Sequence, residues 1–189
     1  LSDNRGEAAM SVETEKTVIQ AYYATITFMD VQLGRVLDTL NELGLRENII
    51  VVFLSDHGYS LGEHDLWQKG NLFEKTVKTP LIIDAPAANY EAATTTSLIE
   101  FVDLYPSLAE MAKLTAPPYL AGRSFTALFD DPNAEIRSSA YSQQFSRASR
   151  TRAKWQGNEV MGHSIRTRRY RYTEWNGGSY GIQLYDFES

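Results

Sequence analysis

The feature that most limits how this chain can fold is a long helical pattern that leads into an unbroken apolar run. From about Val12 to Leu43, apolar residues recur at alternating spacings of three and four, the period of one buried helix stripe. Ser11 is placed to cap the start of this helix and Gly44 to end it. The run Ile49–Leu54 then shows no alternation, which is typical of a strand covered by helices on both faces. A helix that feeds such a strand predicts a doubly wound α/β sheet with this strand central and parallel.

Two further segments extend the predicted α/β part. Leu81–Ile83 is a short β-branched run between Pro80 and Pro86, and it predicts another strand. Asp103 is a candidate N-cap for a helix that runs to about Leu114. Pro106 would lie in the first turn of this helix, where proline is tolerated.

After Pro117 and Pro118 the pattern changes to short, aromatic-rich segments bounded by turns. These segments are Ser139–Phe145, Met161–Thr167, Tyr170–Trp175 and Gln183–Phe187. They predict a small antiparallel sheet, with a turn at residues 176–178. We therefore predict two domains, residues 1–117 in the α/β part and residues 118–189 as an antiparallel-sheet subdomain that is truncated at its end.

Composition and charge narrow the possible classes of protein. The 43% of hydrophobic residues is ordinary for a globular chain, and the lack of cysteine excludes disulfides and thiolate metal sites within it. No apolar run reaches the length of a membrane span, and we expect neither a membrane span nor a nucleic-acid partner. The net charge is −6, yet a single acid accompanies eight basic residues between Arg147 and Arg171. That segment can steer an anionic ligand, or its arginines can pair with the chain's own carboxylates.

The residues with the clearest chemistry follow the predicted strand. Asp56 and His57 offer a carboxylate and an imidazole at the strand's carboxyl end, where open α/β sheets bind ligands. Gly58 permits a sharp turn or a close approach of the backbone. The pair can complete a metal site with ligands from other strands, or it can be a loop carboxylate beside a hydrogen-bonded histidine.

The wider segment closely resembles the metal-and-lysine segment of the type I sulfatases, which belong to the alkaline phosphatase superfamily. The resemblance is carried by Asp56-His57-Gly58, Gly62-Glu63-His64, Leu66-Trp67, Lys69 and Thr79-Pro80-Leu81-Ile82. Residues 22–34 and 102–108 resemble the helices before and after that segment, and residues 161–175 resemble the C-terminal sheet of the iduronate-2-sulfatase-like branch. The resemblance implies part of a doubly wound sulfatase-like sheet with a small C-terminal antiparallel subdomain.

The resemblance also implies roles for individual residues. Asp56 and His57 would be ligands of a divalent cation, which we expect to be calcium, and Lys69 would be a catalytic residue that binds a sulfate oxygen. Many sulfatases place asparagine where His57 stands, and Asp-His is also the pattern of zinc phosphodiesterases of the superfamily. His64, Trp67 and His163 are further candidates for substrate contact. The alternative role is a structural hydrogen bond for His64, core packing for Trp67 and a place within a strand for His163.

Type I sulfatases use a formylglycine nucleophile made from the Cys or Ser of a C/S-x-P-x-R motif, and this chain contains no such motif. We therefore expect the nucleophile on a missing N-terminal portion of the same enzyme, and we expect this chain alone to be inactive. A proteolytically processed product, a truncated chain and a degenerate homologue are three explanations for the missing motif.

The resulting hypothesis is a sulfatase fragment that acts, when complete, on a sulfated carbohydrate such as a glycosaminoglycan. One alternative is a phosphate or phosphonate ester hydrolase of the same superfamily with a two-metal site. Another is a non-catalytic module that binds sulfated glycans. The resemblance suggests a secreted, periplasmic or lysosomal setting, although the sequence contains no targeting signal.

Overall fold

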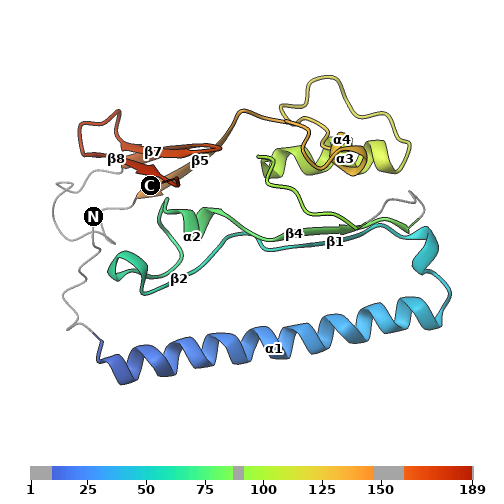
Figure 1. Cartoon of the computed structure of the whole chain (residues 1–189), viewed down its shortest axis with the longest axis horizontal. Helices are drawn as coiled ribbons and strands as arrows, with labels where there is room; N and C mark the ends of the chain where they lie inside the picture. The colour runs from blue at the N-terminus through green and yellow to red at the C-terminus, as the bar shows by residue number, and fades with distance from the viewer. Residues whose placement is uncertain (1–9, 87–91, 147–159, 189) are drawn as a thin grey trace. The chain divides into compact units, whose positions relative to one another are not determined.

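A computed structural model of the chain describes residues 10–86, 92–146 and 160–188 (Figure 1). These residues fall into two units, one formed by residues 10–86 and the other by residues 92–146 with 160–188. The predicted domain boundary at residues 117 and 118 lies inside the second unit, and it stays a prediction.

The first unit opens with the long predicted helix, α1, which covers Val12–Glu42. The hydroxyl of Ser11 accepts a hydrogen bond from the Thr14 N–H at 3.2 Å, so the predicted cap is present. Gly44 has a φ of 65°, a conformation that glycine adopts at low cost, and its N–H donates to the carbonyl of Asn41 at 3.0 Å. The helix and both of its end signals are confirmed.

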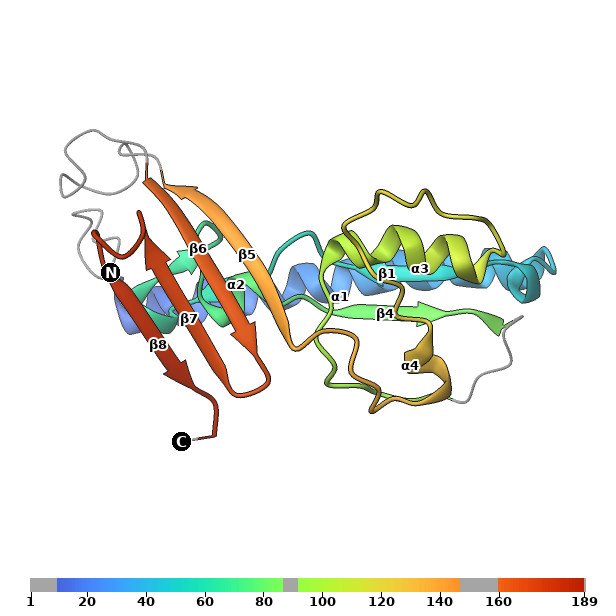
Figure 2. The ribbon, with the colours of Figure 1, turned by 90° about the horizontal axis from the view of Figure 1, so that it is seen from above.

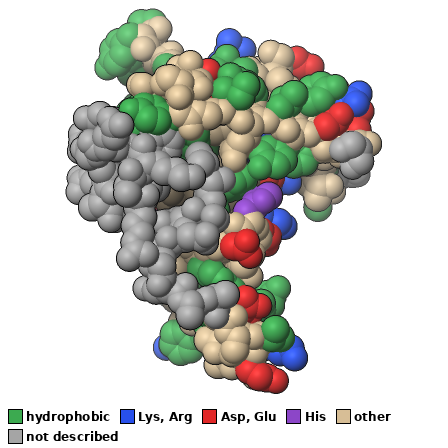
Figure 3. Space-filling model, turned by 90° about the vertical axis from the view of Figure 1, so that its left-hand side faces the viewer, with side chains coloured by type: hydrophobic (Ala, Val, Ile, Leu, Met, Phe, Trp, Pro, Cys, Tyr) green, Lys and Arg blue, Asp and Glu red, His purple; other side chains and the backbone are tan. Residues whose placement is uncertain are grey.

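The predicted burial of the apolar stripe on α1 is not seen. In the part of the chain that the structure describes, no residue of α1 is buried, and Ile26, Met29 and Val36 of the stripe are exposed. Exposed apolar side chains are not confined to α1, and Figure 3 shows others in green on one face of the chain. The spacing of apolar residues sets which side chains share a helix face. Burial of that face also requires another element packed against it, which the spacing does not reveal.

Strand β1, Val51–Leu54, confirms the predicted strand after α1, and it pairs with β4, Leu81–Asp84. The pairing is antiparallel, with Val51 opposite Asp84, so among the described residues β1 lacks the expected parallel neighbour. A continuous apolar run predicts cover on both faces but does not fix the direction of the neighbouring strand, which explains the difference in direction. The predicted cover is not seen among the described residues, since no residue of β1 is buried and Leu54 is exposed. Helix α1 runs alongside this two-stranded ribbon (Figure 1).

A compact segment joins β1 to β4. It contains β2 (Ser60–Leu61), a 3₁₀ turn η2 (Glu63–Asp65), β3 (Trp67–Gln68) and the single-turn helix α2 (Glu74–Val77). Strands β2 and β3 form a hairpin, and Leu66 and Leu72 are buried within the segment. This segment contains most of the residues for which the sequence predicts chemistry.

The helical part of the second unit contains η4 (Phe101–Asp103), α3 (Leu104–Met111) and the short α4 (Ala127–Asp130). Helix α3 confirms the predicted helix but ends three residues before Leu114. Asp103 stands at the start of α3 as predicted, but its side chain makes no cap hydrogen bond to that helix. Its carboxylate accepts a hydrogen bond from the Glu100 N–H at 2.8 Å instead.

The rest of the second unit is the predicted antiparallel sheet, with four strands in sequence order (Figure 2). They are β5 (Ser139–Ser146), β6 (Val160–Thr167), β7 (Tyr170–Trp175) and β8 (Ile182–Asp186). Asn176, Gly177 and Gly178 all have positive φ angles, which confirms the predicted turn after β7. None of the helices formed by the described residues has the length and apolar character that a membrane crossing requires.

The structure describes only part of the basic segment between Arg147 and Arg171. Arg147, Arg150, Arg152 and Lys154 lie outside the described residues. Within the sheet, Arg169 donates to Asp186 with Nη2 at 2.7 Å and lies 3.2 Å from Glu188. This arginine therefore pairs with the chain's own carboxylates, one of the two readings that the sequence allows.

Candidate functional site

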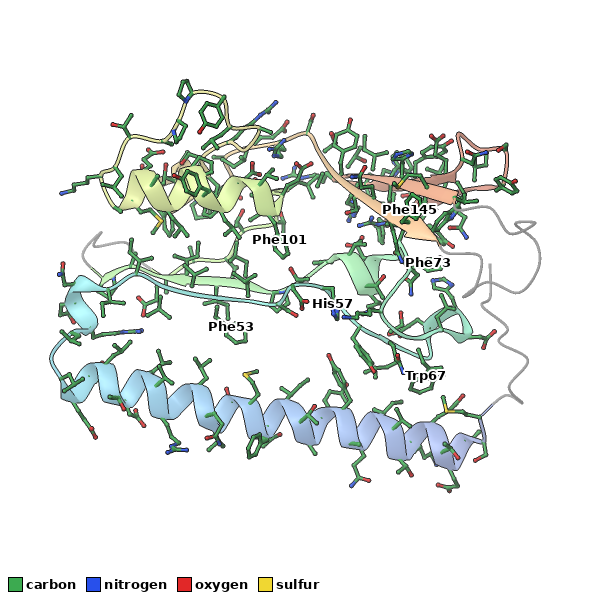
Figure 4. The ribbon with its side chains drawn as sticks, turned by 180° about the vertical axis from the view of Figure 1, so that it is seen from behind. Phe53, His57, Trp67, Phe73, Phe101 and Phe145 are labelled. Carbon is green, nitrogen blue, oxygen red and sulfur yellow. The ribbon has the colours of Figure 1, made fainter. Side chains whose placement is uncertain are left out.

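Asp56 and His57 follow β1, where the chain leaves the sheet and enters the compact segment (Figure 4). The Asp56 side chain is 83% exposed, and that of His57 is 32% exposed. Asp56 Oδ2 lies 3.7 Å from His57 Nε2, and Asp56 Oδ1 accepts a hydrogen bond from the His57 N–H at 3.1 Å. The structure thus brings together a carboxylate oxygen and a ring nitrogen that point to one side of the turn.

The other ring nitrogen of His57 fixes its tautomer. His57 Nδ1 lies 2.7 Å from the carbonyl oxygen of Gly58. Because a carbonyl oxygen can only accept, Nδ1 carries the proton, and in the neutral imidazole Nε2 keeps its lone pair. A backbone hydrogen bond of this kind is the usual support for a metal-binding histidine.

Gly58 is needed because the chain passes directly against residues 75–78. A Cβ atom at this position would lie 2.0 Å from the carbonyl oxygen of Lys75 and 2.9 Å from that of Lys78. The Gly58 N–H donates to the carbonyl of Thr76 at 2.9 Å. The close backbone approach that the sequence suggested is therefore an approach to α2 and the residue after it.

A network of buried polar groups holds this approach in place. The Thr76 hydroxyl contacts Asn71 Oδ1 and the carbonyls of Asn71, at 2.9 Å, and Phe73, at 3.0 Å. Asn71 Oδ1 also accepts the Phe73 N–H at 3.0 Å, and its amide nitrogen lies 3.4 Å from the hydroxyl of buried Ser60. The sequence analysis missed Asn71 and Thr76, since isolated polar residues in a loop give no periodic signal.

Lys69 directly follows the β2–β3 hairpin. Ser60 is paired with Gln68, so Lys69 lies at the open end of the hairpin, the end at which the chain arrives from His57. The Lys69 side chain is exposed, and its backbone lies between Gln68, with a φ of 70°, and Gly70, with a φ of 102°. The hairpin thus links Lys69 to the Asp56–His57 turn through the backbone.

The three weaker candidates lie in different surroundings. The His64 ring stacks on Phe73 with 4.2 Å between ring centroids, and Trp67 is half-buried with its ring over Gly62. Figure 4 shows Trp67 and Phe73 in the segment that follows His57. His163 is exposed on β6, opposite Glu174 of β7, and it belongs to the second unit. Substrate contact by these histidines and Trp67 stays a prediction.

Glu63 closes the tip of the hairpin. Its Oε2 accepts a hydrogen bond from the Leu61 N–H at 2.7 Å. Burial acts to raise the pKa of Glu63, but backbone hydrogen bonds and the charges of Lys75 and His64 together hold it below its usual range. The carboxylate of Glu63 therefore stays ionised and acts as a structural acceptor.

An aromatic pair joins the turn to α1. The rings of Tyr22 and Tyr59 are stacked with 5.0 Å between centroids and an interplanar angle of 27°. Tyr59 stands two residues after His57, so the stack supports the turn from the helix side. The sequence indicated only a packing role for Tyr22, because nothing in its spacing identifies a partner.

The side chains that the sequence singles out here are a carboxylate, an imidazole and, after the hairpin, an ammonium group. A carboxylate and an imidazole suit a divalent cation, and an ammonium group binds an anionic oxygen as a compact charge. Within residues 10–86, 92–146 and 160–188 no group of three or more potential metal ligands comes together. Asp56 and His57 would thus form one side of a larger site.

Two family models match the chain. The sulfatase model matches residues 2–114, and the model of the N-sulphoglucosamine sulphohydrolase C-terminal region matches residues 62–189. Mouse (Mus musculus) iduronate 2-sulfatase is 30% identical over an alignment 212 positions long, gaps included, which covers 86% of this chain. The chain spans 38% of the length of that relative.

Solved structures with the same fold cover nearly the whole chain. A protein in complex with its substrate D-glucosamine-2-N,6-O-disulfate matches 99% of this chain and 38% of its own, with a TM-score of 0.80 and 23% identity. The phosphonate monoester hydrolase of Silicibacter pomeroyi matches 98% of this chain and 38% of its own, with a TM-score of 0.82 and 23% identity. These matches confirm the predicted sulfatase and alkaline-phosphatase-like α/β fold.

Proposed function

This chain belongs to the sulfatase family, and we propose that the complete protein hydrolyses sulfate esters of a sulfated carbohydrate. The proposal is supported by the family match and by relatives such as iduronate 2-sulfatase. Because the chain spans only 38% of that relative, the activity belongs to the whole protein rather than to these residues alone.

In this proposal Asp56 and His57 bind a divalent cation, which we take to be calcium. The observation that carries it is the orientation of His57, whose Nδ1 is held by Gly58 while Nε2 lies 3.7 Å from Asp56 Oδ2. When bound, such a cation neutralises ester oxygens and polarises the bond to be broken. Asp56 and His57 fix where that charge sits, and further ligands come from residues outside the described ranges.

Lys69 has the complementary task of holding an oxygen of the sulfate group. Its exposed ammonium group is a compact point charge with three N–H donors, and it can follow an oxygen that gains negative charge in the transition state. The nucleophile is a formylglycine on a portion of the enzyme that the present sequence does not include, since no C/S-x-P-x-R motif occurs in it. That N-terminal portion is thus the chain's first partner.

The test uses the complete enzyme and a chromogenic aryl sulfate. Chelation should abolish hydrolysis and added Ca²⁺ should restore it, while Asp56→Ala and His57→Ala should each lower kcat/KM by on the order of 10²-fold or more. Thermal unfolding of Asp56→Ala should change little, because Asp56 is exposed. Full activity in the chelated enzyme or in both variants would disprove the proposed cation site.

A second candidate function is hydrolysis of a phosphonate or phosphate ester. It is favoured by the Asp-His pair and by the structural match to a phosphonate monoester hydrolase. Parallel assays with an aryl phosphonate monoester decide between the two, because the preferred ester is the one with the higher kcat/KM. A non-catalytic glycan-binding module predicts a third result, in which heparin binding survives both chelation and Asp56→Ala and no ester is cleaved.

A further inference from the structure

The hairpin before Lys69 has an unusual backbone. His64 and Asp65 both have a φ of 58°, and Gln68 has a φ of 70°. Residues other than glycine adopt these left-handed conformations at a cost, although histidine and aspartate tolerate them better than most. Such a conformation persists only when surrounding contacts hold it, and strained backbone of this kind is frequent at functional sites.

A contact that holds the turn of this hairpin from outside is the ring stack between His64 and Phe73. Their centroids are 4.2 Å apart, and the rings are inclined by 19°. The backbone of Phe73 is itself fixed, because its N–H donates to Asn71 Oδ1 at 3.0 Å and its carbonyl accepts the Thr76 N–H at 3.0 Å. Phe73 therefore offers a rigid platform on which the strained turn rests.

Backbone hydrogen bonds carry this restraint toward Lys69. The Leu66 N–H donates to the carbonyl of Glu63 at 3.0 Å, and the Gly62 N–H donates to the carbonyl of Leu66 at 2.9 Å. Strand β3 then runs from Trp67 to Gln68 and ends beside Lys69. A displacement of His64 would therefore shift the short strand that presents Lys69.

We propose that His64 is a positioning residue, whose stack on Phe73 holds the hairpin in the conformation that presents Lys69 to the anionic ester. The proposal rests on the proposed function, because it assigns His64 an effect on the rate through Lys69. It differs from substrate contact by His64, since the ring face is used for stacking and Phe73 is an equal partner in the effect.

The kinetic test uses the complete enzyme with an aryl sulfate and two single variants that each remove one ring. His64→Asn keeps a residue that tolerates the left-handed backbone but removes the stack, and Phe73→Leu removes the partner while His64 stays. Each should lower kcat/KM by on the order of 10²-fold, the effect of a small misplacement of a catalytic group. In a Lys69→Ala background His64→Asn should cause no further loss, because the group that it positions is gone.

Two kinetic results would overturn the proposal. One is an effect of His64→Asn that adds in full to that of Lys69→Ala, and the other is a Phe73→Leu variant with wild-type kinetics. Rescue also separates this role from a purely structural one. If His64 only supported folding, stabilising ligands or lower temperature would restore the rate of His64→Asn, whereas a misplaced Lys69 keeps kcat/KM low in fully folded protein.

A second measurement does not depend on catalysis. Amide hydrogen exchange in His64→Asn should become faster within residues 62–70 and stay unchanged in β5–β8. If the wild-type protein cleaves no sulfate ester, the proposed function fails while this arm still tests the role of the stack. Unchanged exchange in residues 62–70 would overturn the positioning role even in an active sulfatase.

Discussion

The carboxylate of Asp103 and the guanidinium of Arg137 form a two-pronged ion pair inside the second unit. Arg137 Nε donates to Oδ2 at 2.7 Å and Nη2 donates to Oδ1 at 2.5 Å, while Asp103 is fully buried. The backbone N–H groups of Glu100 and Arg123 also donate to this carboxylate, at 2.8 and 2.7 Å. One buried charge thereby joins the start of α3 to two segments that lie far along the chain.

This ion pair predicts a loss of stability in acid. Burial acts to raise the pKa of Asp103, but the hydrogen bonds from Arg137 and from two backbone N–H groups hold the pKa below its ordinary value. A group with a lowered folded pKa stabilises the fold above its unfolded pKa, near 3.9, and loses that contribution as the pH falls toward the folded value. The midpoint of urea unfolding should therefore decrease from about pH 4 downward.

Asp103→Asn tests the same pair at neutral pH. Removing the charge leaves Arg137 without its principal partner, so unfolding should become easier by about 3–5 kcal/mol, and the acid-dependent loss should become smaller. Asp130→Asn is the matched control, because Asp130 is exposed in α4 and the change should stay within about 0.5 kcal/mol. Equal midpoints for the two variants would contradict the role of the pair.

A matched pair of glycine substitutions tests the close backbone approach at the site. Gly58→Ala would place a Cβ 2.0 Å from a backbone oxygen, and it should destabilise the protein by about 1–3 kcal/mol or more. Gly34→Ala in α1 meets no atom within 4 Å, and it should stabilise the protein by about 0.5–1 kcal/mol because alanine favours the helix. Thermal unfolding of both variants measures these opposite changes in stability. A destabilised Gly34→Ala beside an unaffected Gly58→Ala would refute the geometry.

Lys69→Ala tests the sulfate-binding role in the complete enzyme. We expect kcat/KM to fall by about 10²- to 10³-fold or more, because a charge that stabilises the transition state is removed. The exposed side chain contributes little to the fold, so the unfolding temperature should stay near that of the wild type. Lys78→Ala removes another exposed lysine nearby and should leave kcat/KM unchanged. An early-melting Lys69→Ala with normal kinetics would exclude the assignment.

A double-mutant cycle between Tyr22 and Tyr59 measures the stack that joins α1 to the turn. The coupling free energy should be about 0.5–1.5 kcal/mol in favour of the stacked pair, determined from urea unfolding of the two single alanine variants and the double variant. Phe28→Ala on the same helix is the control, since Phe28 is 69% exposed and should show no coupling to Tyr59. Additive effects of Tyr22→Ala and Tyr59→Ala would count against a supporting role.

The features that the sequence predicted well are local ones. Helix α1, its Ser11 cap and its Gly44 end follow from spacing and from the conformations that these residue types prefer. The four strands of the C-terminal sheet follow from short, aromatic-rich segments bounded by turns, among them the turn at residues 176–178. Gly58 was expected to permit either a turn or a close approach, and the structure shows the close approach.

The features that the sequence could not predict depend on partners distant in space. Asp103 carries the pattern of a helix cap, yet its main partner is Arg137, 34 residues away. The apolar run in β1 indicates burial but not strand direction, and its described neighbour, β4, is antiparallel. The stack of His64 on Phe73 depends on positive φ angles in the hairpin, which no periodic pattern reveals.

The hydrogen bond from Gly58 to Thr76 and the contact of Asn71 with Ser60 join residues that are near one another along the chain. Closing so short a loop costs little chain entropy, and local contacts of this kind form early when a protein folds. The turn with Asp56 and His57 and the hairpin before Lys69 can therefore take shape before the distant strands pair. Insertions that spare residues 55–80 and the part of α1 that carries Tyr22 would leave these contacts in place.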